Sequence, residues 1–126
     1  MFKIHHRLVG GVEPYEYKEV KSGEEVQAGE ALVLAAGKLT KCGATVKPEY
    51  IAMGKAAKNG IAPVIRVLPT TVFAATAQAG QNTLTAGSKV TLTADGMDVT
   101  ATTTDGVFML DTPAAAAGGE CVGRFV

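Results

Sequence analysis

The stretch AGEALVL, residues 28–34, sets the pattern of this chain, because a related stretch, AGSKVTL, follows at residues 86–92. A shift of 58 residues brings residues 28–68 into register with residues 86–126, and identical residues recur along the whole alignment. Each segment has an Ala-Gly turn, short apolar runs separated by turns, an Ala-rich connection and a closing apolar run. The alignment predicts a chain built from two similar halves.

The short runs between these turns favour strands over helices. They are rich in β-branched residues and bounded by Gly, Pro or charged residues, and no window keeps a 3.6-residue period over three turns. The predicted class is therefore all-β, a small β-barrel or sandwich of two pseudo-repeated halves with an extended N-terminal arm. The arm covers residues 1–14, and a single β domain covers 15–126, with the repeats at about 20–68 and 79–126.

Two Asp-Gly turns in the second half predict a three-stranded meander. They fall at Asp95 and Asp105, and they separate runs at Lys89–Thr93, Met97–Thr104 and Val107–Leu110. Consecutive strands joined by such turns pair as hairpins. We therefore expect the middle, Thr-rich run to pair on both sides.

Composition limits the functions that the chain can have. Its 126 residues carry 12 basic and 12 acidic side chains, and this neutrality argues against a nucleic-acid partner. No apolar run is long enough to span a membrane, and the polar start lacks a signal-peptide core, so we expect a soluble protein made in the cytoplasm. With four Phe, three Tyr and no Trp, the predicted core is thin, which favours self-association.

Charge is also unevenly distributed along the chain. The first 66 residues hold ten basic against seven acidic side chains, and the remaining 60 hold two against five. This asymmetry suits contacts between copies of the chain, or else it is only a scatter of solvated charge.

Residues for catalysis or metal binding are scarce. Cys42 and Cys121 are too few and too far apart to indicate a metal site or a disulfide framework. The two histidines, His5 and His6, are adjacent, and neighbouring side chains on a strand point in different directions, so they make poor joint ligands. No motif pairs a nucleophile with a base. We expect no enzyme activity, no cofactor and no metal.

The arm and two arginines supply the predicted contact surface. The arm places apolar side chains among basic ones, and these either order against another subunit or fray as a terminus does. The repeat aligns the two arginines near the ends of the closing runs, where they meet carboxylates of a partner or remain solvated. The predicted contact residues are Phe2, Lys3, Ile4, Arg7, Leu8, Val9, Arg66 and Arg124.

One motif resembles that of a modified carrier domain. The spacing of Gly23, Val26, Gly29 and Leu32 is similar to the Gly-x-x-Val-x-x-Gly-x-x-Leu stretch of biotinyl and lipoyl carrier domains. Those domains are flattened barrels of two similar halves with a modifiable lysine on a hairpin. The resemblance implies modification of Lys38 or Lys55, although neither lies in the carriers' own lysine motif.

A resemblance that covers residues 20–126 is to the small head-decoration, or capsid cement, proteins of tailed bacteriophages. It is carried by Lys21–Leu34, Ile51–Ala56, Ala86–Leu92 and Gly118–Val126, mostly through turn glycines and small apolar residues. It implies a non-enzymatic virion protein that stabilises the outer capsid surface. The implied partners are the major capsid protein and two further copies of the chain in a homotrimer, with the N-terminal arm ordering on the shell.

Overall fold

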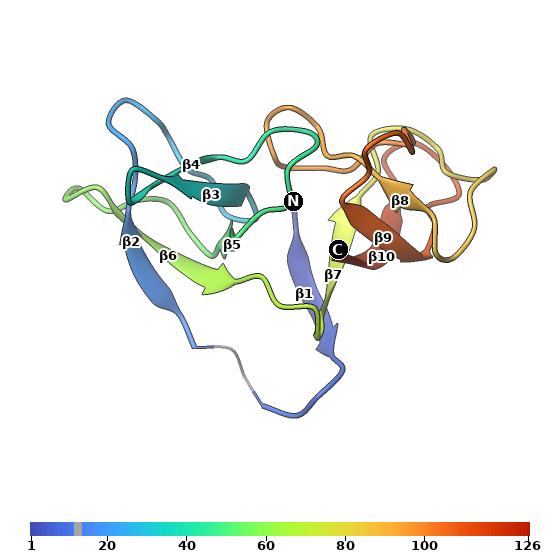
Figure 1. The fold of residues 1–126 in the computed structure, drawn as a ribbon, viewed down its shortest axis with the longest axis horizontal. Coiled ribbons are helices and arrows are strands. Elements are labelled where there is room, and N and C mark those ends of the chain that lie inside the picture. Colours follow the sequence, from blue (N-terminus) through green and yellow to red (C-terminus); the bar gives the residue numbers. More distant parts are fainter. Residues whose placement is uncertain (12–13) are drawn as a thin grey trace.

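Two antiparallel five-stranded sheets pack together in the computed structural model, which describes residues 1–11 and 14–126 (Figure 1). The first sheet, in the order β2-β6-β5-β3-β4, consists of β2 (Glu16–Glu19), β3 (Ala31–Ala35), β4 (Lys38–Lys41), β5 (Tyr50–Ala52) and β6 (Ile61–Arg66). The second, in the order β1-β7-β10-β9-β8, consists of β1 (Lys3–Arg7), β7 (Thr71–Thr76), β8 (Lys89–Val90), β9 (Phe108–Thr112) and β10 (Glu120–Phe125). The all-β prediction is confirmed, and the architecture is a sandwich, not a closed barrel.

The two sheets repeat one another at the 58-residue shift seen in the sequence. Strands β2, β6, β5 and β3 correspond to β7, β10, β9 and β8, and each set lies in the same order within its sheet. Backbone hydrogen bonds repeat too, since Gly29 N donates to Ala52 O at 2.7 Å and Gly87 N donates to Leu110 O at 2.7 Å. Both glycines have positive φ, +82° and +93°, which explains why the Ala-Gly turn recurs.

The repeat breaks by one residue in the last strand. In the first sheet Tyr50 pairs with Arg66, but its counterpart Phe108 pairs with Phe125 and not with Arg124. The β9–β10 register shifts just before this point. Because side chains alternate along a strand, this slip turns β9 over relative to β5. Phe108 lies in the core between the sheets, whereas its counterpart Tyr50 belongs to the second apolar cluster.

The core between the sheets is centred on all four phenylalanines of the chain. Phe2, Phe73, Phe108 and Phe125 are each at most 1% exposed, and their neighbouring ring centroids lie 5.1 to 5.7 Å apart. The rings meet in tilted or edge-to-face arrangements, which are favourable for aromatic pairs. Few aromatic residues are present, but the fold gathers most of them into one cluster.

Residues 3–7 form a strand instead of part of the predicted free arm. Strand β1 pairs with β7 from Thr71 to Ala74, and Leu8 N donates to Thr70 O at 2.8 Å beyond the strand. The side chain of Phe2 is part of the aromatic cluster. The arm prediction is therefore wrong for the described part of this segment, while residues 12–13 lie outside the described residues.

The predicted meander is also wrong in its middle strand. Strand β8 pairs directly with β9, and the segment Met97–Thr104 forms turns with isolated bridges at Val99. Local hydrogen bonds explain the difference. The Thr93 hydroxyl accepts a bond from Asp98 N at 3.1 Å, and the Thr100 hydroxyl accepts one from Thr102 N at 3.0 Å. Such side-chain bonds to nearby backbone compete with a strand ladder.

The two sheets differ in how their outward faces are covered. A second apolar cluster buries the outward face of the first sheet, and its members are Val20, Val26, Leu32, Leu39, Tyr50, Ala52, Ala62 and Val64. The outward face of the second sheet contributes no member to either apolar cluster among the described residues. The outward face of the second sheet is therefore the candidate functional surface.

Candidate docking face

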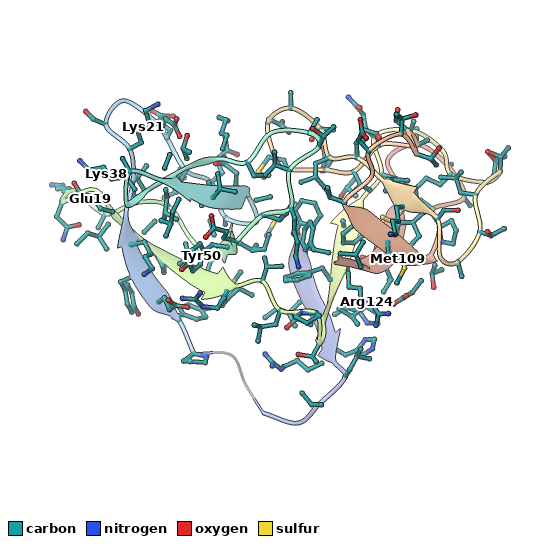
Figure 2. The ribbon with its side chains drawn as sticks, in the orientation of Figure 1. Glu19, Lys21, Lys38, Tyr50, Met109 and Arg124 are labelled. Carbon is teal, nitrogen blue, oxygen red and sulfur yellow. The ribbon has the colours of Figure 1, made fainter. Side chains whose placement is uncertain are left out.

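Two rows of side chains form the outer face of the second sheet. Directly opposed residues of antiparallel strands point to the same side, and every second residue along a strand does so as well. The strand pairings therefore define the outer face as Lys3, His6, Val72, Ala74, Lys89, Met109, Thr112, Val122 and Arg124. Figure 2 labels two of these residues, Met109 and Arg124, which pair across neighbouring strands.

The outer face combines unpaired cations with a partly exposed apolar centre. Met109 and Val122 are half-buried at its centre, and the cations Lys3, Lys89 and Arg124 surround them. Among the described residues, no carboxylate forms an ion pair with any of these three side chains. A face of this kind is complementary to an acidic surface with small apolar contacts.

Arg66, the counterpart of Arg124 in the first half, is bound within the chain. Its Nε and Nη2 donate to the two carboxylate oxygens of Glu16 at 3.1 and 3.0 Å, and its guanidinium lies 5.1 Å from the centre of the Tyr50 ring. A forked pair of this geometry holds the side chain firmly. The two arginines that the sequence treats as equivalent therefore differ, and only Arg124 remains available to a partner.

The structure does not bring the eight predicted contact residues together. Phe2 is buried in the core, which corrects its predicted role as a contact. Ile4, Leu8 and Val9 are exposed, at 42%, 52% and 54%, but Ile4 lies opposite Phe73 and so points away from the outer face. Arg7 pairs opposite Thr71, also on the inward side. Of the predicted residues, only Lys3 and Arg124 share the outer face.

The sequence reasoning missed Lys89, Met109 and Val122, although the repeat contains a signal for two of them. Lys89 stands where the first half has Ala31, and Met109 stands where it has Ile51. Ala31 and Ile51 are fully buried in the core between the sheets, whereas Lys89 is exposed and Met109 half-buried. A buried alanine replaced by lysine indicates that this position of the repeat unit is open to solvent in the second half.

The candidate carrier lysines lie in different parts of the first half. Lys38 directly follows the two-residue turn of the β3–β4 hairpin, where it pairs with Ala35. Its partly exposed side chain lies 3.2 Å, Nζ to Oε1, from Glu19 of β2, and Figure 2 labels both residues. Lys55 lines a polar hollow of about 500 Å³ together with Glu24 and Glu25.

The two histidines do not diverge as expected. A bulge in β1 lies between Ile4 and His6, and it places the rings of His5 and His6 side by side, with their Nδ1 atoms 2.7 Å apart. A β-bulge interrupts the alternation of side chains along a strand, which explains why these two neighbouring rings lie close together. Within residues 1–11 and 14–126, no group of three or more His, Cys, Asp or Glu side chains is placed to hold a metal ion.

The two cysteines are expected to be unreactive while the protein is folded. Burial raises the pKa of both Cys42 and Cys121 to about 11, and only the thiolate is a good nucleophile. Iodoacetamide at pH 8 should therefore leave both thiols unmodified in the native protein and alkylate both in denaturant. Mass spectrometry of the two samples measures this, and rapid alkylation of the native protein at either residue would contradict the burial of that thiol.

Known proteins give no further guidance to the role of this face. No family model matches the chain, and no curated protein matches it. In the described part of the chain, no helix is long and apolar enough to cross a membrane.

Proposed function

We propose that this protein is a non-enzymatic structural protein that binds and stabilises the outer surface of a bacteriophage capsid, through the outer face of its second sheet. The partner is the major capsid protein, and an acidic patch on its outer surface binds the outer face of the second sheet. The proposal is carried by one observation, the cluster of unpaired cations around Met109 and Val122.

The repeat supports a docking role for this face. In the first half, the counterparts of Lys89 and Met109 are Ala31 and Ile51, which are buried in the core between the sheets. The counterpart of Val122 is Val64, which is buried in the apolar cluster on the outward side of the first sheet. At these three positions the first half buries apolar side chains within the chain, whereas the second half leaves its side chains exposed or half-buried and available to another protein.

Weak contacts suffice for such a protein when symmetry multiplies them. Each copy buries a modest area on the shell, and a trimer held at three points dissociates only when all three contacts break together. We infer that the copies act as homotrimers on the virion surface. The exposed apolar side chains of Ile4, Leu8 and Val9 supply contacts at the edge of the sheet, between copies or with the shell.

Binding of charge variants to undecorated capsids tests the proposal. We expect K89E and R124E each to weaken binding by about tenfold or more, because each places a like charge against an acidic patch. Wild-type binding should weaken as salt rises, since exposed charges are screened. Co-sedimentation with purified capsids measures both effects.

Lys58 offers a matched control for these variants. It is an exposed lysine in the first half, between β5 and β6, away from the outer face. K58E makes the same change in net charge, and we expect it to bind as the wild type does. Equal binding by K58E, K89E and wild type would overturn the assignment of the outer face, while failure of the wild type to bind any capsid would overturn the function.

A further inference from the structure

The carboxyl group of Glu30 is buried where the two halves of the chain meet. Glu30 directly precedes β3 and is 2% exposed. Its neighbour Ala31 donates its backbone N–H to Gly96 O at 2.8 Å, and Gly96 belongs to a turn of the second half. A Cβ atom on Gly96 would lie 3.6 Å from Glu30 Cγ, so the side chain of Glu30 packs against that turn.

This carboxyl group is incompletely satisfied. Glu30 Oε1 lies 3.9 Å from the Nζ of Lys41, whose side chain is 46% exposed, and Glu30 Oε2 is buried with no hydrogen-bond partner among the described residues. An ionised carboxylate normally accepts several hydrogen bonds, and a buried one that lacks them is costly. A single distant ammonium group compensates for little of this cost.

The groups that face Glu30 are mostly acidic. The positively charged group is the ammonium of Lys41 in β4. The acidic groups are Glu24, in the segment before β3, and Asp95, in the turn of the second half. Cys42 follows β4 as a buried neutral thiol. Burial raises the pKa of the Glu30 carboxyl most strongly, Lys41 and a hydrogen bond from the backbone of Gln27 lower it, and Glu24 and Asp95 raise it further. The net pKa of Glu30 lies above its ordinary value.

The repeat shows that a carboxyl group is not needed for the local backbone structure. Ser88 occupies the position of Glu30 in the second half, and the same backbone bond forms at both places. Ala52 N donates to Glu30 O at 2.9 Å, and Leu110 N donates to Ser88 O at 2.8 Å. The buried acid is thus a feature of the contact between the halves and not of the repeated unit.

We propose that Glu30 makes the contact between the two halves sensitive to pH, so that the protein is more stable when this carboxyl is protonated than when it is ionised. A group whose pKa is raised by folding contributes stability below its unfolded pKa, and this contribution is lost as the pH rises through the folded pKa. The contact is therefore firmest below the ordinary carboxyl pKa of 4.5 and weakens as the pH rises through the raised pKa of Glu30. The proton is exchanged with water, and no other reaction is involved.

The variant E30Q mimics the protonated carboxyl in size and charge. Thermal unfolding of E30Q and wild type should be compared between pH 5 and pH 8, because other titrating groups are common to both and cancel in the difference. We expect E30Q to unfold about 3–6 °C above wild type at pH 8 and close to it at pH 5. E25Q, a change at an exposed glutamate in the same segment, should follow wild type at every pH.

Hydrogen exchange locates the effect within the molecule. The amide of Ala31 bonds to Gly96, and that of Leu92 bonds to Ala44 at 2.9 Å, so both bonds join the two halves. At pH 8 we expect both amides to exchange several-fold more slowly in E30Q than in wild type, with no change at Val20. An E30Q difference that is the same at pH 5 and pH 8, or that lowers the unfolding temperature at pH 8, would overturn the proposal.

Discussion

Replacing Phe2 with alanine is expected to destabilise the protein by about 3–5 kcal/mol. The Phe2 ring is 1% exposed, and its centroid lies 5.7 Å from that of Phe108 and 5.1 Å from that of Phe125. Its removal leaves a cavity between the two sheets and breaks two favourable aromatic contacts. Domains of this size have a total stability of about 5–15 kcal/mol, so the loss is a large part of the whole.

Denaturant unfolding measures this effect, and Ile4 provides the control on the same strand. Ile4 is 42% exposed, and we expect Ile4→Ala to cost less than about 1 kcal/mol. If the first residues formed a free arm, Phe2→Ala would leave the free energy of unfolding unchanged, whereas a core strand predicts a large loss. Equal unfolding midpoints for Phe2→Ala and wild type would show that the first strand is not part of the folded core.

Gln81→Ala is expected to cost about 2–5 kcal/mol, because one buried amide joins two separate loops. The side chain of Gln81 is 0% exposed, its Nε2 donates to Thr100 O at 2.8 Å, and its Oε1 accepts from Ala114 N at 2.9 Å. Removal leaves a buried carbonyl and a buried N–H without these partners, at about 1–3 kcal/mol each. Gln81 lies between β7 and β8, and the connections on either side of β9, which hold Thr100 and Ala114, would lose their common anchor.

Two further variants separate the hydrogen bonds from simple loss of volume. Gln81→Met keeps most of the side-chain volume but neither bond, and we expect it to be nearly as destabilised as Gln81→Ala. Gln78→Ala changes an exposed glutamine of the same connection and should lie within about 0.5 kcal/mol of wild type. Wild-type stability of Gln81→Met in denaturant unfolding would mean that the two bonds contribute nothing.

Local signals in the sequence predict the repeated part of the fold well. Gly29 and Gly87 mark turns that need positive φ, and their spacing alone indicates two related sheets. The failures involve partners that are distant in sequence. The apolar residues of β1 have no neighbour to pack on until β7 and Phe125 are in place, so a local interpretation leaves them as an arm.

The candidate site was predicted less well for a similar reason. The sequence aligns Met109 with the buried Ile51, but a one-residue slip between β9 and β10 turns Met109 to the outer face, and no local pattern reports that slip. Lys3 and Arg124 were predicted as contacts, yet their common face exists only because β1 and β10 both pair with β7. The hydroxyls of Thr93 and Thr100 also accept hydrogen bonds from nearby backbone N–H groups, and the strand propensity of threonine does not reveal such bonds.

The pairing of β1 with β7 and the packing of Phe2 on Phe125 also determine when the molecule can fold during its synthesis. Phe2 leaves the ribosome well before its aromatic neighbour Phe125, because almost the whole sandwich lies between them in the sequence. Until Phe125 emerges, Phe2 lacks part of its aromatic cluster, and its exposed ring favours association with other nascent chains. The second sheet therefore closes only after β10 has been synthesised, and its non-local pairing makes that closure slow.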